Sequence, residues 1–156
     1  MVFEFRLERV LRYREEEERQ ALVFLAKTQL QREMVQRGLL VLQRELEEVR
    51  EVFNNMKGSQ VDGQQLSMLS RRWRWLRLEK EKQSRLLDQW NEKVEKAQEH
   101  WLEVRAAKEA LMKLRQKAFR EFLGNLQRAE TRELDEVGLR IFWLEGGVKE
   151  GSTQAS

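Results

Sequence analysis

The 156-residue sequence predicts an all-α protein: a long antiparallel coiled coil of two helices with an overhanging C-terminal helix and a disordered tail. Three observations lead to this fold class. The chain contains no proline, the residue type that most strongly breaks a helix. Charged residues make up 37% of it, and residue types that favour helices are abundant. Apolar residues also recur in two heptad runs, which a short turn-forming segment separates.

The first predicted helix covers about residues 2–56. When Leu11 is placed at heptad position a and Leu7 at position d, eleven of the fifteen a and d positions are apolar. Apolar residues sustained at these positions, with charged residues elsewhere, are typical of a coiled coil. We therefore expect the following side chains to face a partner helix: Leu7, Leu11, Arg14, Glu18, Ala21, Leu25, Thr28, Arg32, Val35, Leu39, Leu42, Leu46, Val49, Phe53 and Met56.

The connection is predicted at residues 57–65, KGSQVDGQQ, whose Gly, Ser and Asp residues end helices and form turns. A connection this short makes neighbouring helices antiparallel. The second predicted helix covers about residues 66–144, with fourteen of its nineteen a and d positions apolar. These positions are Leu66, Leu69, Trp73, Leu76, Lys80, Gln83, Leu87, Trp90, Val94, Ala97, Trp101, Val104, Lys108, Leu111, Arg115, Ala118, Phe122, Asn125 and Ala129.

The two predicted helices differ in length, roughly 80 and 120 Å at 1.5 Å per residue. If they pair symmetrically about the connection, residue 2 faces about residue 120, and residues 121–145, here called the overhang, have no partner within the chain. Residues 1–145 then form a single coiled-coil domain, and the Gly- and Ser-rich residues 146–156 form a disordered tail. An exposed apolar stripe favours binding of another protein. The overhang has one, which comprises Phe122, Leu126, Ala129, Val137, Ile141 and Leu144, with Leu123, Leu134 and Phe142 beside it.

The stretch SRRWRWLRLEK, residues 70–80, interleaves arginine with tryptophan, which also occurs in binders of nucleic acid and membrane surfaces. The heptad register separates these residues in space, because Trp73 and Leu76 take positions a and d, whereas the arginines take positions on the outer side or the flanks of the helix. Trp75 falls at position c, away from the partner helix. It either lies flat over neighbouring aliphatic side chains or contacts a partner protein. One exposed aromatic residue is a poor platform for nucleic acid, although residues 66–120 carry a net charge of +7.

Residue types that carry chemistry are sparse. Without cysteine, the chain forms no disulfide, no cysteine-based metal site and no cysteine nucleophile. His100 is the only histidine, and no phosphate loop, metal constellation or catalytic triad spacing is present. We therefore expect no enzymatic activity, no metal and no cofactor. The first residues have no apolar run long enough for a signal peptide, and no stretch reaches the length of a membrane span, so we expect a cytoplasmic protein.

Three segments carry a resemblance to a known family. Residues 3–27, FEFRLERVLRYREEEERQALVFLAK, contain Leu-Glu-x-Val-Leu, an arginine, glutamates and a Leu-Ala pair. Residues 87–101, LDQWNEKVEKAQEHW, contain Gln-Trp-x-x-Lys-Val, and residues 128–142, RAETRELDEVGLRIF, contain Glu-x-x-x-Leu-Asp-Glu. Together these segments resemble the family of the flagellar export protein FliJ over nearly the whole chain.

The resemblance implies a cytoplasmic, non-enzymatic component of the flagellar type III export apparatus, folded as an antiparallel coiled coil like the stalk of rotary ATPases. Implied partners are the hexameric export ATPase FliI, the export gate protein FlhA and export chaperones, with no nucleic acid. Contact with the membrane is then peripheral and occurs through these partners. The implied contacts with the ATPase ring are Phe122, Leu126, Leu134, Asp135, Glu136 and Val137, and those with the gate are Arg72, Trp73, Trp75 and Leu76.

Three other functions are compatible with the sequence. One is the equivalent stalk of a virulence-type secretion system. Another is a generic coiled-coil adaptor, in which the overhang pairs with a second copy of the chain. The last is a binder of nucleic acid or of a membrane surface, which would use the positively charged residues 66–120.

Overall fold

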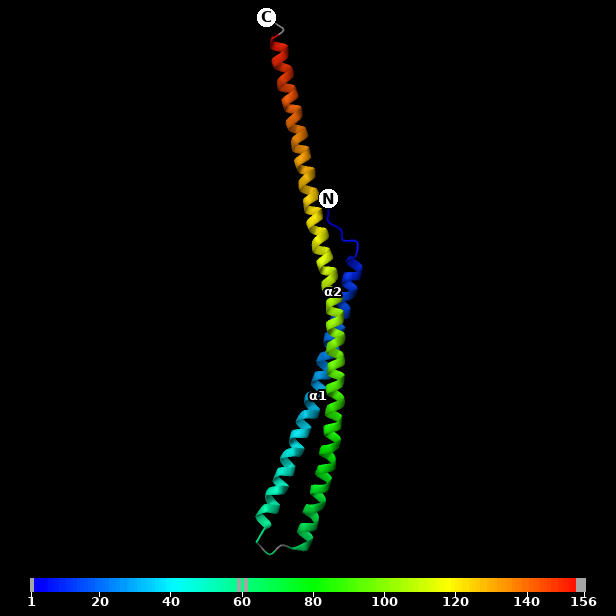
Figure 1. Cartoon of the computed structure of the whole chain (residues 1–156), viewed down its shortest axis with the longest axis vertical. Helices are drawn as coiled ribbons and strands as arrows, with labels where there is room; N and C mark the ends of the chain where they lie inside the picture. Colours follow the sequence, from blue (N-terminus) through cyan, green and yellow to red (C-terminus); the bar gives the residue numbers. More distant parts are fainter. Residues whose placement is uncertain (1, 59, 61, 154–156) are drawn as a thin grey trace. The chain divides into compact units, whose positions relative to one another are not determined.

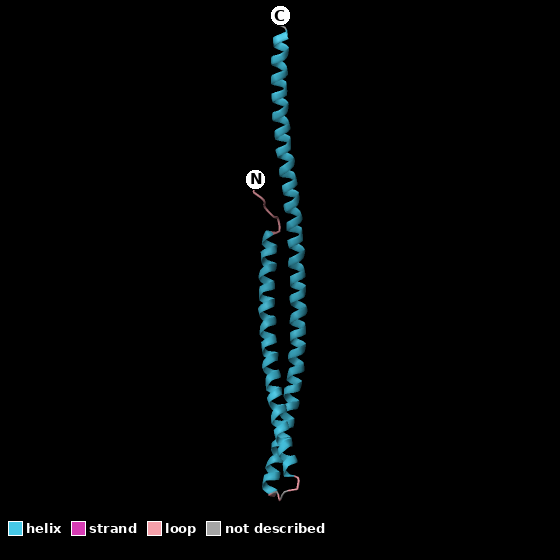
Figure 2. Ribbon diagram, turned by 90° about the vertical axis from the view of Figure 1, so that its left-hand side faces the viewer, coloured by secondary structure: helices cyan, strands magenta, loops and turns pink. Residues whose placement is uncertain are grey.

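The computed structural model of the chain describes residues 2–58, 60 and 62–153, and their side chains up to residue 146. It contains two helices, α1 (Glu8–Met56) and α2 (Gly63–Thr153), and no strand among the described residues (Figures 1 and 2). The predicted all-α fold class is confirmed. The chain divides into two compact units, one formed by Tyr13–Ala107 and the other by Met1–Arg12 with Lys108–Ser156.

Within Tyr13–Ala107, α1 and α2 lie side by side and run in opposite directions (Figures 1 and 2). Two clusters of buried apolar side chains join them. In one cluster Leu25 of α1 packs with Val94 and Ala97 of α2, and Trp101 packs against them. The other cluster consists of the buried Leu46, Val49 and Leu76, with Leu42, Phe53, Leu69 and Trp73 packed around them.

The heptad register predicts which side chains these helices bury. Between Tyr13 and Ala107, every predicted a and d position is buried or half-buried except Leu66, which lies in the first turn of α2. Thr28 is a polar residue among them, and its hydroxyl donates to the carbonyl oxygen of Leu25 at 2.8 Å. This bond satisfies the hydroxyl locally, so Thr28 occupies a buried position without an unpaired polar group.

The connection is shorter than predicted, because α2 begins at Gly63 rather than at about residue 66. The side chain of Asp62 accepts a hydrogen bond from the backbone N–H of Gln64 at 3.2 Å, and its carbonyl oxygen accepts one from the N–H of Leu66 at 3.1 Å. Asp62 is therefore an N-cap, which lets the helix start three residues earlier. Just after α1, Gly58 has a φ of 91°, a conformation that glycine adopts at low cost.

In the other unit, the start of α1 differs from the prediction. The helix begins at Glu8 and not at about residue 2; residues 2–5 have no regular secondary structure, and residues 6 and 7 form a turn. The ring of Phe3 lies 5.1 Å from that of Phe119 and 5.5 Å from that of Phe122, measured between centroids. These aromatic contacts with α2 favour a non-helical path for the first residues. They also agree with the predicted pairing of residue 2 with about residue 120.

The far end of α2 also lies beyond its predicted position. The helix continues to Thr153, nine residues past the predicted end at residue 144, because no proline interrupts it. The predicted disordered tail, residues 146–156, thus overlaps α2 up to Thr153. Residues 154–156 lie outside the described residues, as do the side chains from residue 147 onward, and the disorder of the tail stays a prediction.

Alanine substitutions at two glycines, Gly38 and Gly58, test the backbone conformation of α1 and of the connection. Gly38 lies in the interior of α1, where a Cβ atom would meet only Gln83 Oε1, at 3.9 Å. We expect Gly38→Ala to stabilise the protein by about 1 kcal/mol, since alanine has the higher helix propensity. Gly58→Ala is expected to cost about 1 kcal/mol because of its positive φ. Urea unfolding followed by circular dichroism measures both; a loss of stability on Gly38→Ala would contradict the helical placement of that residue.

Candidate partner-binding surfaces

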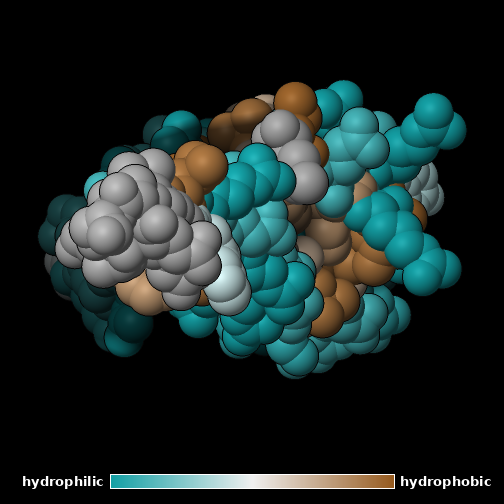
Figure 3. Space-filling model, turned by 90° about the horizontal axis from the view of Figure 1, so that it is seen from above, coloured by the Kyte–Doolittle hydropathy of each residue, from teal (hydrophilic) through white to brown (hydrophobic). Residues whose placement is uncertain are grey.

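The candidate sites among the described residues are exposed faces of the two helices. No group of three or more His, Cys, Asp or Glu residues with the spacing of a metal site occurs among them. In the same part of the chain, neither helix contains a segment long and apolar enough to cross a membrane. Seen from above, the visible surface mixes apolar side chains, in brown, with hydrophilic ones, in teal (Figure 3).

The overhang is the first candidate surface. Every side chain from residue 127 to residue 145 is exposed. Leu134 is 72% exposed, and Val137, Ile141 and Leu144 are also large exposed apolar residues. They follow one another at intervals of three and four residues and so share one side of the helix. Asp135 and Glu136, the two acidic residues among the predicted ring contacts, are exposed as well.

The base of the overhang differs from the rest, because other side chains of the same unit partly cover it. Phe122 is half-buried beside Phe3 and Phe119, and Leu126 is also half-buried. Of the predicted ring contacts, these two therefore have the smallest free surface. Leu134 and Val137 remain the apolar residues of that set that are available to a partner.

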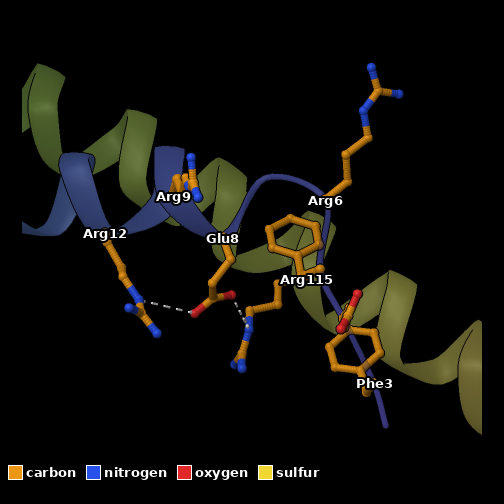
Figure 4. A pocket seen from close by; sticks show the side chains of 8 residues that line it. Phe3, Arg6, Glu8, Arg9, Arg12 and Arg115 are labelled. Atoms are coloured by element: carbon orange, nitrogen blue, oxygen red, sulfur yellow. Dashed lines mark hydrogen bonds and ion pairs between the residues drawn. The ribbon is translucent and has the colours of Figure 1, made fainter. Parts of the chain in front are cut away.

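A polar cluster lies beside this base, where α1 begins. The carboxylate of Glu8 lies between two arginines: Arg115 Nε is 3.1 Å from one oxygen and Arg12 Nε is 3.8 Å from the other (Figure 4). These groups line a hollow of about 520 Å³ together with Phe3 and Arg6 among others. Arg6 points away from Glu8 in this view (Figure 4). The Glu8–Arg115 pair joins α1 to α2 and helps to set their register.

The second candidate surface surrounds Trp75. Its indole is 58% exposed, and Met68 and Leu78 are large exposed apolar residues nearby in the sequence. Arg72 is exposed too. The predicted segregation of the Arg/Trp stretch is confirmed, because Trp73 packs against the cluster of Leu46, Val49 and Leu76 while Trp75 does not.

The four predicted gate contacts are therefore unequal. Leu76 has 0% exposure and offers no surface to a partner while the helices are paired. Trp73 is half-buried and borders a hollow of about 300 Å³ that is also lined by Leu46, Arg77 and Lys80. Trp75 and Arg72 provide the accessible part of this surface.

A third surface lies on α1, and the repeat of apolar residues at positions a and d does not predict it. The side of α1 turned away from α2 within Tyr13–Ala107, here called the outer face, consists of heptad positions b, c and f from Tyr13 to Arg44, all exposed. The apolar residues of this face include Tyr13, Val23, Leu30, Met34, Leu40 and Val41. The pattern is visible in the sequence, but only when positions c and f are examined as well as a and d.

The outer face is also hollowed at one point. A groove of about 280 Å³ is lined by Val23 and Phe24, with Arg19 and Lys27 and the polar Glu16 and Gln20 around them. Phe24, at position g, is 56% exposed and borders the outer face. A solvent-facing helix surface normally carries polar residues, so the apolar residues of this side make it a third candidate surface.

Comparison with known proteins identifies the family. The family model described as Flagellar FliJ protein matches residues 3–147, and this range contains all three of the segments that carry the resemblance. No curated protein and no solved structure matches the chain. The match covers far more than half of the sequence and agrees with the paired helices described above. The chain therefore belongs to the FliJ family of non-enzymatic proteins of the flagellar export apparatus.

Proposed function

We propose that this chain is a stalk that binds the export ATPase ring through its overhang and links the ring to the export gate and to export chaperones. The observation that carries the proposal is the unequal length of the paired helices. Residues 127–145 present an amphipathic helix whose side chains are exposed. Nearer the connection, α2 packs against α1, and Phe119 and Phe122 of α2 contact Phe3, which precedes α1. A long helix with an unpartnered apolar stripe is suited to insertion into a ring of subunits.

The Trp75 surface is the proposed contact with the gate. Exposed tryptophan and arginine side chains contribute strongly to protein interfaces, and Trp75 and Arg72 are both accessible. Trp73 borders this surface, and Leu76 supports it from beneath through its packing against Leu46 and Val49. Under this proposal the protein works in the cytoplasm and reaches the membrane only through its partners. The family match favours a flagellar system over a virulence-type one.

The test is whether the chain bridges the two partners. We expect the export ATPase and the gate protein to elute together in size-exclusion chromatography when the full chain is present. Trp75→Ala is expected to weaken gate binding by about tenfold, because it removes a large exposed anchor, and to leave helicity unchanged. Leu102→Ala, at an exposed position of α2 in the same unit, is the matched control and should bind as the native chain does.

Two results would count against the proposal. If the three proteins fail to form a joint complex at concentrations where each pair binds, the chain does not link ring and gate. If Trp75→Ala and Leu102→Ala bind the gate equally well, Trp75 does not belong to the gate contact.

A further inference from the structure

The outer face of α1 has no function in the stalk proposal, although it is apolar and uncovered. Within Tyr13–Ala107, α2 covers the opposite side of α1 (Figures 1 and 2). Leu30, Met34 and Val41 follow one another at intervals of four and seven residues and so lie on one side of the helix. A binding partner for this face must therefore bring an apolar stripe of its own.

Cations border the apolar stripe of the outer face. Lys27 lies three residues before Leu30, Arg37 three residues after Met34, and Arg44 three residues after Val41, so all three are on the same side of the helix. Positions b, c and f from Tyr13 to Arg44 contain four basic and two acidic residues, a net charge of +2. The face therefore suits a helix that carries carboxylates around its apolar residues.

The overhang has the matching chemistry. Its apolar stripe, Leu134 to Leu144, spans about 15 Å, and the outer-face stripe, Leu30 to Val41, spans about 16 Å. Glu130 lies four residues before Leu134, and Glu145 lies four residues after Ile141, on the same side of the helix. The overhang as a whole contains six acidic and three basic residues, a net charge of −3.

The positions of the charges match as well as their signs. Lys27 and Arg44 enclose the stripe of the outer face and are roughly 26 Å apart along α1. Glu130 and Glu145 enclose the stripe of the overhang and are roughly 23 Å apart along α2. Carboxylates at both ends of one stripe can thus meet cations at both ends of the other, while the apolar residues between them become buried away from water.

We propose that, in the free protein, the overhang of one copy of the chain docks on the outer face of a second copy. The contact buries two apolar surfaces that the paired helices leave uncovered, and it pairs their opposite charges. One consequence rests on the stalk proposal: the same overhang that enters the ATPase ring is covered before it does so. The ring must then displace the second copy, so binding to the ATPase ring and self-association of the chain are mutually exclusive.

Analytical ultracentrifugation of the isolated chain tests this contact without the ATPase or the gate. The full chain is expected to self-associate at micromolar concentration, more strongly at about 0.05 M salt than at about 0.5 M, since salt screens the charges. Leu30→Asp, on the outer face, should weaken association at least about tenfold. Leu102→Asp is the matched control, because it places the same charge at a similarly exposed leucine of α2 in the same unit. It should associate as the native chain does.

A mixing experiment then identifies the two surfaces. A chain that ends at Leu123 keeps the outer face and loses most of the overhang, whereas the Leu30→Asp chain keeps the overhang and has a damaged face. Each is expected to sediment as a monomer alone, and the two together should form a mixed complex. The proposal is overturned if the native chain is monomeric, if the shortened chain still self-associates, or if the mixture does not form a complex. It is overturned equally if the outer face binds anionic lipid vesicles while the chain stays monomeric.

Discussion

A chain that ends at Leu123 is expected to leave the export ATPase at its basal rate, whereas the full chain is expected to stimulate it. The truncation removes nearly all of the exposed apolar stripe, including Leu134 and Val137, and leaves the contacts of Phe3 with Phe119 and Phe122 in place. Without the stripe, the overhang no longer offers an apolar helix face for the ring to bind. ATP hydrolysis by the cognate ATPase, titrated with either chain, measures the difference.

The truncation needs a control that separates loss of the stripe from loss of length. Leu134→Asp combined with Val137→Asp keeps the full length and should also abolish stimulation. Leu139→Asp adds a charge at an exposed leucine on the opposite side of the same helix, and it should stimulate normally. Equal stimulation by the full and the shortened chain would move the ATPase contact to the paired part of the coiled coil.

The largest loss of stability is expected from Leu76→Ala. Leu76 is fully buried, and it packs with Leu46 and Val49 near the connection. Removing a buried leucine side chain costs roughly 2–5 kcal/mol, because apolar contacts are lost and a cavity remains. A coiled coil of two helices has few layers that could compensate. Urea unfolding monitored by circular dichroism should show a lower midpoint with an unchanged slope.

Leu78→Ala is the matched control for Leu76→Ala. Leu78 lies two residues further along the same helix and is largely exposed. Its truncation should change the free energy of unfolding by no more than about 0.5 kcal/mol. Equal losses at Leu76 and Leu78 would mean that α2 is rotated relative to the heptad register described here.

The buried side of each helix could be predicted from the sequence because the heptad repeat is a local signal that extends over many turns. It assigned Trp73 and Leu76 to the seam between the helices and Trp75 to the surface, and the structure agrees. It also placed the polar Thr28 at a buried position. A regular repeat constrains burial even at polar positions, since each residue follows the rotation of the helix.

The ends of the helices were less predictable, because contacts outside the repeat determine them. The non-helical residues before Glu8 pack through Phe3 on the rings of Phe119 and Phe122, which are far away in the sequence, and no local pattern indicates this contact. The start of α2 depends on the single side chain of Asp62. The outer face was missed for a different reason, since a two-helix coiled coil accounts for apolar residues at positions a and d only.

The order in which the helices pair follows from the connection at Gly58 and Asp62. Leu46 meets Leu76 close to this turn, Leu25 meets Val94 and Ala97 further away, and Phe3 meets Phe119 last along the chain. Closing a short loop costs less conformational entropy than closing a long one, so pairing should nucleate at the turn and proceed toward the N-terminus. During synthesis, α1 emerges from the ribosome before α2 does, with apolar residues uncovered on both of its sides. The nascent protein therefore depends on prompt nucleation at the turn to avoid aggregation.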